Sequence, residues 1–144
     1  MKKLRNYFGT IFVLLMIVIL SGCATTAANA LMSKESQVKL RSIQTRAFDT
    51  TDKKKMMQTV ISTMQDLDFV IDKADFMLGS VTGSKFLGYE VVAMTVTVRP
   101  KGEKQLLVRA NAQYGIKSVE DPVTYQDFFT ALEKAIFLTA QQVD

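Results

Sequence analysis

The spacing of hydrophobic and polar residues changes several times along the chain, and each change predicts a different element. Residues 38–49 alternate between apolar and polar positions with a change of phase near Ser42, which predicts a strand containing a bulge. Apolar residues then recur at helical spacing and predict a helix over about residues 52–67. The polar run 49–52 offers oxygen atoms for its N-cap. Asp68 stands just after its end, where the backbone often turns left-handed.

Shorter apolar segments follow, and their alternation predicts further strands. These segments lie at residues 69–71, 78–85, 92–99 and 106–113. The sequence DKAD at 72–75 is typical of a turn, and RPKGEK at 99–104 predicts a hairpin turn between the last two strands.

A long helix is expected near the C-terminus. Apolar residues recur at helical spacing from Tyr125 to Thr139, and Asp121 precedes Pro122, which suits the first helical position. The pattern predicts a helix over residues 122–141, roughly 30 Å long, enough to lie across a small sheet.

The predicted order of elements is therefore β-α-β-β-β-β-α. Antiparallel strands with helices segregated to one face are typical of an α+β fold. We expect a two-layer sandwich over residues 38–144, with about four to five strands and both helices on one face, in a helix-grip-like arrangement. The chain has one cysteine, so core packing and not an internal disulfide must stabilise this domain.

Residues 1–22 have the pattern of a secretory signal peptide. Lys2, Lys3 and Arg5 precede an uninterrupted run of ten apolar residues at 11–20. A bilayer-spanning helix needs roughly 20 apolar residues, so the shorter run favours a signal peptide over the alternative of a transmembrane anchor.

Removal of this segment changes the charge of the protein. The chain has 18 basic and 14 acidic residues; without the three basic residues of the leader they become 15 and 14, and the net charge falls from +4 to +1. A nearly neutral domain gives no support for nucleic-acid binding.

The single cysteine ends this segment in the sequence Leu20-Ser21-Gly22-Cys23, which resembles the lipobox of bacterial lipoproteins. The resemblance implies that a diacylglyceryl group is attached to the Cys23 thiol, that the chain is cleaved before it, and that the new amino group is acylated. Several acyl chains together anchor a protein stably. Ala24 follows, where Asp would signal retention, so the resemblance implies the outer membrane, with the domain facing the periplasm. The alternative is an ordinary signal peptide with an incidental cysteine.

Residues 23–37 are small and polar, and they predict a lipidated tether. The roughly 14 residues after the cysteine reach at most about 45 Å when fully extended. The membrane is therefore an expected partner through the lipidated cysteine.

The chain offers few candidates for catalysis. It contains no histidine, the commonest acid–base group and metal ligand, and lipidation would consume its one thiol. Helix ends, turns and an N-cap explain the remaining carboxylate pairs, which are Asp66 with Asp68, Asp72 with Asp75, and Glu120 with Asp121. We therefore expect a non-enzymatic protein with no cofactor and no metal site.

The sequence KFLGYE at 85–90 places apolar side chains between two predicted strands, where a polar turn is expected. Phe86, Leu87 and Tyr89 surround Gly88. Exposed apolar groups on a loop often mark a contact with a partner or a membrane, so these three residues are the candidate partner contacts. The alternative is that one or two of them fold back and cover the core.

Residues 43–85 combine a helix with the stretch DLDFVIDKADFMLGSVTGSK, before two further strands and a final helix. Over about residues 40–143 this arrangement resembles small Gram-negative envelope lipoproteins of an uncharacterised family. The order of elements is also similar to that of the helix-grip domains of BamC, the lipoprotein subunit of the outer-membrane β-barrel assembly machinery. The BamC likeness is one of topology, with no diagnostic residue. Asp68 departs from the pattern, which has glycine at this turn.

These observations predict a membrane-anchored lipoprotein that docks other envelope proteins, as an accessory subunit of a secretion or outer-membrane assembly complex. A groove between the C-terminal helix and the sheet, or the loop at 85–90, is the expected contact surface. The alternative is a periplasm-facing carrier of a small apolar ligand or lipid in a helix-grip cavity.

Overall fold

The computed structural model describes residues 36–141. The predicted signal peptide, the lipobox, Cys23 and most of the predicted tether lie outside the described residues. A helix at residues 36–43 comes first. The elements that follow are β1 (Thr45–Phe48), α3 (Lys53–Asp66), β2 (Val70–Asp75), β3 (Ser80–Leu87), β4 (Glu90–Lys101), β5 (Gln105–Tyr114), β6 (Lys117–Ser118) and α4 (Pro122–Gln141).

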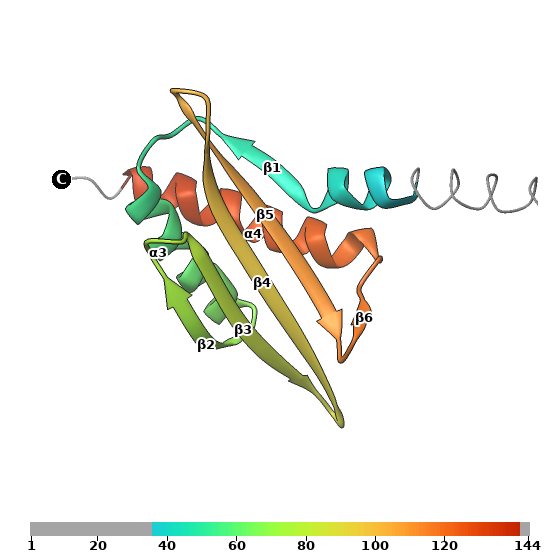
Figure 1. The fold of residues 1–144 in the computed structure, drawn as a ribbon. Helices are drawn as coiled ribbons and strands as arrows, with labels where there is room; N and C mark the ends of the chain where they lie inside the picture. The colour runs from blue at the N-terminus through green and yellow to red at the C-terminus, as the bar shows by residue number, and fades with distance from the viewer. Residues whose placement is uncertain (1–35, 142–144) are drawn as a thin grey trace, which may run out of the picture. The chain divides into compact units, whose positions relative to one another are not determined.

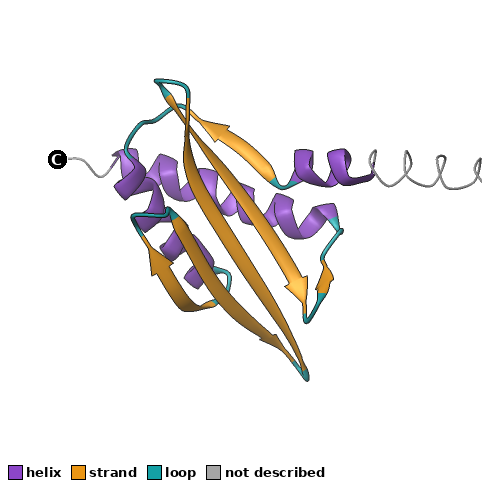
Figure 2. Cartoon of the chain, viewed as in Figure 1, coloured by secondary structure: helices purple, strands orange, loops and turns teal. Residues whose placement is uncertain are grey.

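The domain is α+β, as the sequence predicts. Within the described residues a six-stranded sheet has the order β1-β5-β4-β3-β2, and the two-residue strand β6 pairs with β5 on the same edge as β1. Every pair of neighbouring strands is antiparallel. Figure 1 shows α3 and α4 behind the sheet, and Figure 2 shows the same two-layer arrangement by element type.

The core lies between the sheet and the helices. Alternate residues of β4 and β5 are buried on the helix side, and both helices contribute an apolar stripe. The largest fully buried side chains are Tyr125, Phe128, Phe129 and Leu132 of α4, Met57, Val60 and Met64 of α3, and Val81, Met94, Val96, Val98 and Val108 of the sheet. Burial of each such side chain contributes about 1.5–3 kcal/mol.

The helices α3 and α4 begin and end close to the predicted positions because their signals are local. The Asp52 carboxylate accepts a hydrogen bond from the Lys55 amide at 2.8 Å and caps α3. At the other end Asp68 has a φ of +66°, the left-handed conformation expected there. The Phe69 amide donates to the Met64 carbonyl at 2.9 Å, which completes a Schellman-type cap with aspartate where glycine is usual. The predicted limits of α4 are confirmed.

The prediction of a strand over residues 38–49 is wrong in its first half. Residues 36–43 are helical, and the strand runs only over Thr45–Phe48. Leu40 and Ile43, three residues apart, both pack against the core, and a helix places such a pair on one face. A stretch this short fits periods of 2 and 3.6 equally well.

The turn predicted at residues 72–75 is also wrong. Strand β2 continues to Asp75, with its register interrupted at Asp72, and the turn comes later, at residues 76–79. The Asp75 carboxylate accepts from the Leu78 amide at 2.8 Å, and Gly79 has a φ of +71°. The bulge leaves Asp72 without a partner in β3, and the pairing of the two strands continues on both sides of it.

Candidate functional site

The sequence KFLGYE forms the tip of the β3–β4 hairpin. The strands extend into the predicted loop, so that only Gly88 and Tyr89 form the turn. Tyr89 is 109% exposed and Phe86 is 69% exposed, and neither folds back on the core. Leu87 is 45% exposed and faces the helix side of the sheet, whereas Phe86 faces the opposite side. The three candidate residues therefore do not share one orientation.

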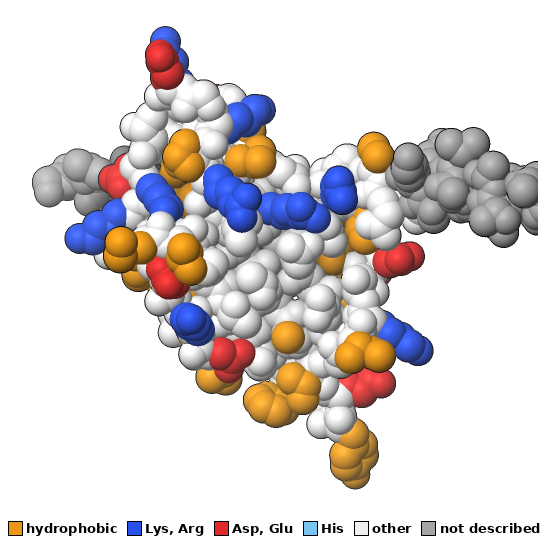
Figure 3. Space-filling model, in the orientation of Figure 1, with side chains coloured by type: hydrophobic (Ala, Val, Ile, Leu, Met, Phe, Trp, Pro, Cys, Tyr) orange, Lys and Arg blue, Asp and Glu red, His pale blue; other side chains and the backbone are white. Residues whose placement is uncertain are grey.

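A second turn lies beside this tip. Val92 of β4 pairs with Tyr114 at the end of β5, and Ile116 in the following turn is 99% exposed. Val91, opposite Phe86, is also exposed. We call this cluster the apolar end: Phe86, Leu87, Tyr89, Val91, Tyr114 and Ile116. Figure 3 shows apolar side chains gathered at the corresponding lower end of the visible face.

Sequence reasoning did not identify Val91, Tyr114 and Ile116 as part of this surface. The sequence YGIK at 114–117 has the same local pattern as LGYE at 87–90, an apolar residue beside a turn glycine. This pattern could have identified the second turn as a candidate surface. That the two turns lie at one end of the sheet follows only from the register of β4 with β5.

A groove opens beside the apolar end, between the sheet and the helices. It encloses about 200 Å³ and is lined by residues from both helix ends and the adjoining strands: Leu67, Phe69, Lys85, Leu87, Val92, Met94, Tyr114, Val119, Thr124, Asp127 and Phe128. We call it the apolar groove. Leu87 and Tyr114 belong to both surfaces, so the groove and the apolar end are continuous.

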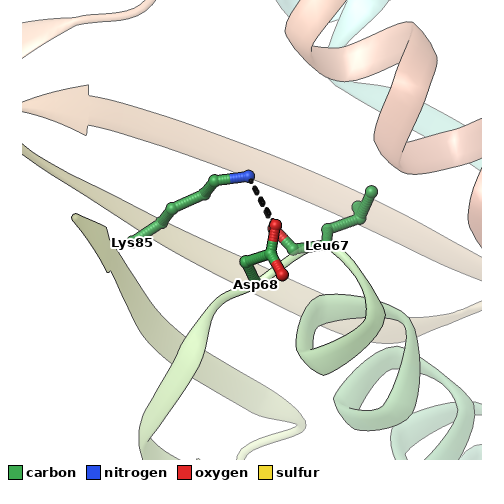
Figure 4. A network of polar contacts seen from close by, with 3 residues as sticks. All are labelled: Leu67, Asp68 and Lys85. Atoms are coloured by element: carbon green, nitrogen blue, oxygen red, sulfur yellow. Dashed lines mark hydrogen bonds and ion pairs between the residues drawn. The ribbon is translucent and has the colours of Figure 1, made fainter. Parts of the chain in front are cut away.

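Lys85 lines the groove where α3 ends. Its Nζ donates to the Leu67 carbonyl at 2.9 Å and lies 3.3 Å from Asp68 Oδ2 (Figure 4). A cation is favourable at a helix C-terminus, because the last carbonyl groups carry partial negative charge. The lysine side chain therefore holds the left-handed turn against β3. Because its charge is paired with Asp68, it adds no unpaired charge to the groove.

Four carboxylates of the pairs considered in the sequence make structural contacts. Asp68 contacts Lys85, and Asp72 accepts from Ser84 Oγ at 2.7 Å. Asp75 stabilises its turn, and Asp121 accepts from the Val123 amide at 3.1 Å at the start of α4. Within residues 36–141 no group of three or more acidic, histidine or cysteine side chains is placed to hold a metal ion.

Another exposed apolar turn lies at the opposite end of β3. Phe76, Met77 and Leu78 are exposed there, and sequence reasoning missed them because the turn was predicted four residues too early. Lys53 Nζ donates to the Met77 carbonyl at 2.9 Å and secures this turn. Met77 does not line the apolar groove, which distinguishes this turn from the apolar end.

No helix within the described part of the chain combines the length and apolar character required to cross a membrane. No protein-family model matches this sequence, and a search of curated proteins returns no match. The resemblance to envelope lipoproteins and to BamC therefore stays a prediction.

Proposed function

We propose that this protein is a non-enzymatic lipoprotein, anchored in the outer membrane through Cys23 and facing the periplasm, that docks another envelope protein as an accessory subunit of a secretion or assembly complex. The observation that carries the proposal is the continuity of the apolar end with the apolar groove. Contiguous exposed apolar surface is uncommon on monomeric proteins and marks interaction sites.

The volume of the groove favours docking over the alternative of a lipid carrier. Cavities that hold drug-sized ligands enclose about 300–1,000 Å³, and an engineered cavity of about 150 Å³ holds benzene. The groove, at about 200 Å³, matches one aromatic or branched side chain of a partner. A whole acyl chain is larger than this space.

The arrangement suits an interface with one central anchor. A few buried apolar or aromatic side chains contribute most of the energy at protein interfaces, and a surrounding rim excludes water from them. Here the groove would receive the anchor of the partner, while Phe86, Tyr89 and Ile116 would supply the rim. Each apolar side chain fully buried by the partner contributes up to about 1.5–3 kcal/mol.

Site-specific photo-crosslinking in intact envelopes tests the proposal. A photoreactive phenylalanine analogue at Tyr89 or Ile116 is expected to form one defined protein adduct. The same analogue at Met77, an equally exposed apolar turn residue, is the matched control and should not form it. The substitution Phe86→Asp should abolish the adduct at Tyr89, and Cys23→Ala should weaken it because the domain is no longer held beside the membrane.

Adducts of equal yield at Met77, or an adduct at Tyr89 that survives Phe86→Asp, would contradict docking at the apolar end. Adducts with lipid in place of protein would show that this end contacts the bilayer.

A further inference from the structure

The face of the sheet that the helices leave open carries two arginines without acidic partners. Arg109 of β5 pairs with Thr97 of β4, and Arg99 lies two residues further along β4, so both side chains leave the sheet on the open face. Diagonal neighbours of this kind are roughly 7–8 Å apart, within reach of long side chains. Neither arginine takes part in the ion pairs that the described residues form.

The guanidinium of Arg109 is only partly satisfied by the protein. Its Nη2 donates to Gln44 Oε1 over 3.4 Å, which is a long contact. Its Nε is buried and has no hydrogen-bond partner among the described residues. A buried donor without an acceptor is rare in native structures, because the unmade hydrogen bond costs free energy. Because Nε has almost no accessible surface, an acceptor from outside the chain meets the Nη atoms of this guanidinium, which the one long contact to Gln44 leaves incompletely satisfied.

A hollow lined by uncharged polar side chains adjoins Arg109 through Gln44. It encloses about 400 Å³ and its lining includes Thr95, Asn111, Gln113 and Ser118. We call it the polar hollow. Amide and hydroxyl groups both donate and accept hydrogen bonds, as sugar hydroxyls do. No acidic side chain lines it, and its volume is within the range of small-molecule sites.

Figure 3 shows how side chains of different types are distributed on the open face. Lys and Arg side chains form a band across the strands, and an uncharged area separates this band from the apolar side chains at the lower end. The polar hollow and the arginine pair share no residue with the apolar end or the apolar groove. A ligand that fits this face combines an anionic group with several hydroxyl groups.

We propose that the open face binds an anionic saccharide. Its phosphate or carboxylate group contacts Arg99 and Arg109, where planar guanidinium groups suit bidentate binding, and its hydroxyl groups bind in the polar hollow. The site is separate from the proposed docking function.

Titration of the full mature chain in neutral detergent micelles tests this site, with NMR signals of the Arg109 Nε–H and the Asn111 side-chain amide as readouts. The probes are glucuronate and glucose phosphate, with plain glucose and inorganic phosphate as half-ligands. The two anionic sugars should give saturable shifts at both groups. Each half-ligand should bind at least about tenfold more weakly, because it meets only part of the site.

Variants assign the two halves of the site. Arg109→Gln, or the exposed Arg99→Gln if the first variant fails to fold, should weaken glucose phosphate binding by about tenfold or more. Asn111→Ala should weaken the sugar phosphate but not inorganic phosphate. Lys104→Gln removes the same charge from the β4–β5 turn and is the matched control, with binding unchanged.

Vesicles distinguish the sources of the ligand. Binding to phosphatidylinositol vesicles, but not to phosphatidylcholine vesicles, would identify a membrane headgroup, and binding to soluble sugars alone would identify a free saccharide. Absence of saturable shifts with every anionic probe overturns the proposal. A loss of affinity for glucose phosphate in the Lys104→Gln control that equals the loss in Arg109→Gln overturns it too. Inorganic phosphate that binds as tightly as glucose phosphate overturns the saccharide assignment. None of these results bears on the crosslinks of the apolar end.

Discussion

The side-chain amide of Gln44 donates a hydrogen bond of 3.0 Å to the hydroxyl of Tyr125, across 81 residues of sequence. The same hydroxyl accepts from the Ala112 amide at 3.3 Å and donates to the Val119 carbonyl at 2.6 Å. On this edge β5 pairs with β1 up to Arg109 and with β6 from Gln113. The contacts of the Tyr125 hydroxyl lie between these two paired segments. A side chain of α4 thus completes the edge of the sheet.

Removal of this hydroxyl should destabilise the domain. Tyr125→Phe keeps the ring in the core but leaves the amide of Gln44 and the backbone groups of Ala112 and Val119 without their buried partner. The free energy of unfolding is expected to fall by about 2–4 kcal/mol, as measured by urea denaturation. The control is Tyr89→Phe, whose hydroxyl is exposed and whose effect should stay within about 0.5 kcal/mol. Equal effects of the two variants would contradict the role of the buried hydroxyl.

Substitutions of Asp68 should change stability in opposite directions. Asp68→Gly removes the strain of the left-handed conformation. It also removes the ion pair with Lys85, in which the Asp68 side chain is 84% exposed. Because exposed pairs contribute little, a gain of about 0.5–1 kcal/mol is expected. Asp68→Ala loses the ion pair and keeps the backbone strain, so it should cost about 1 kcal/mol. Thermal unfolding of both variants measures the difference, and the same sign for both would refute the account.

Gly83 is required by close packing and not by its backbone conformation. A Cβ atom there would lie 2.8 Å from the Val70 carbonyl oxygen and 3.0 Å from Met64 Cε. The side chain of Met64 can move but the β2 backbone cannot, so Gly83→Ala should destabilise the domain by about 1–3 kcal/mol. Thr82→Ala, on the open face of the same strand, is the comparison and should cost less than about 1 kcal/mol. A neutral Gly83→Ala variant would show that β2 and β3 separate readily.

The exposed apolar residues should not contribute to folding. Phe86→Asp, Ile116→Asp and the control Met77→Asp should each leave the free energy of unfolding within about 0.5 kcal/mol of the wild type. Urea denaturation of each variant checks this. A large loss of stability in Phe86→Asp alone would mean that its loss of crosslinking reports unfolding and not docking.

The sequence by itself determined the elements whose signals are dense and local. The helices α3 and α4 have long apolar stripes with polar caps, and the β4–β5 hairpin has two long alternating strands around a turn glycine. The left-handed Asp68 was predictable because it directly follows the last apolar position of a helix. The sequence placed Phe86 and Tyr89 beside a turn glycine but left open whether they are exposed or cover the core, and the structure shows them exposed.

Only the tertiary structure decided the features that depend on residues far apart in the chain. The segment before Gln44 is helical because Leu40 and Ile43 reach the core together, and β2 extends to Asp75 because β3 pairs with it through a bulge. The register of the sheet brings Ile116 beside Val91 and places Arg99 beside Arg109. Local patterns fix which residues prefer a helix or a strand, but long-range pairing and packing decide which surfaces those residues form together.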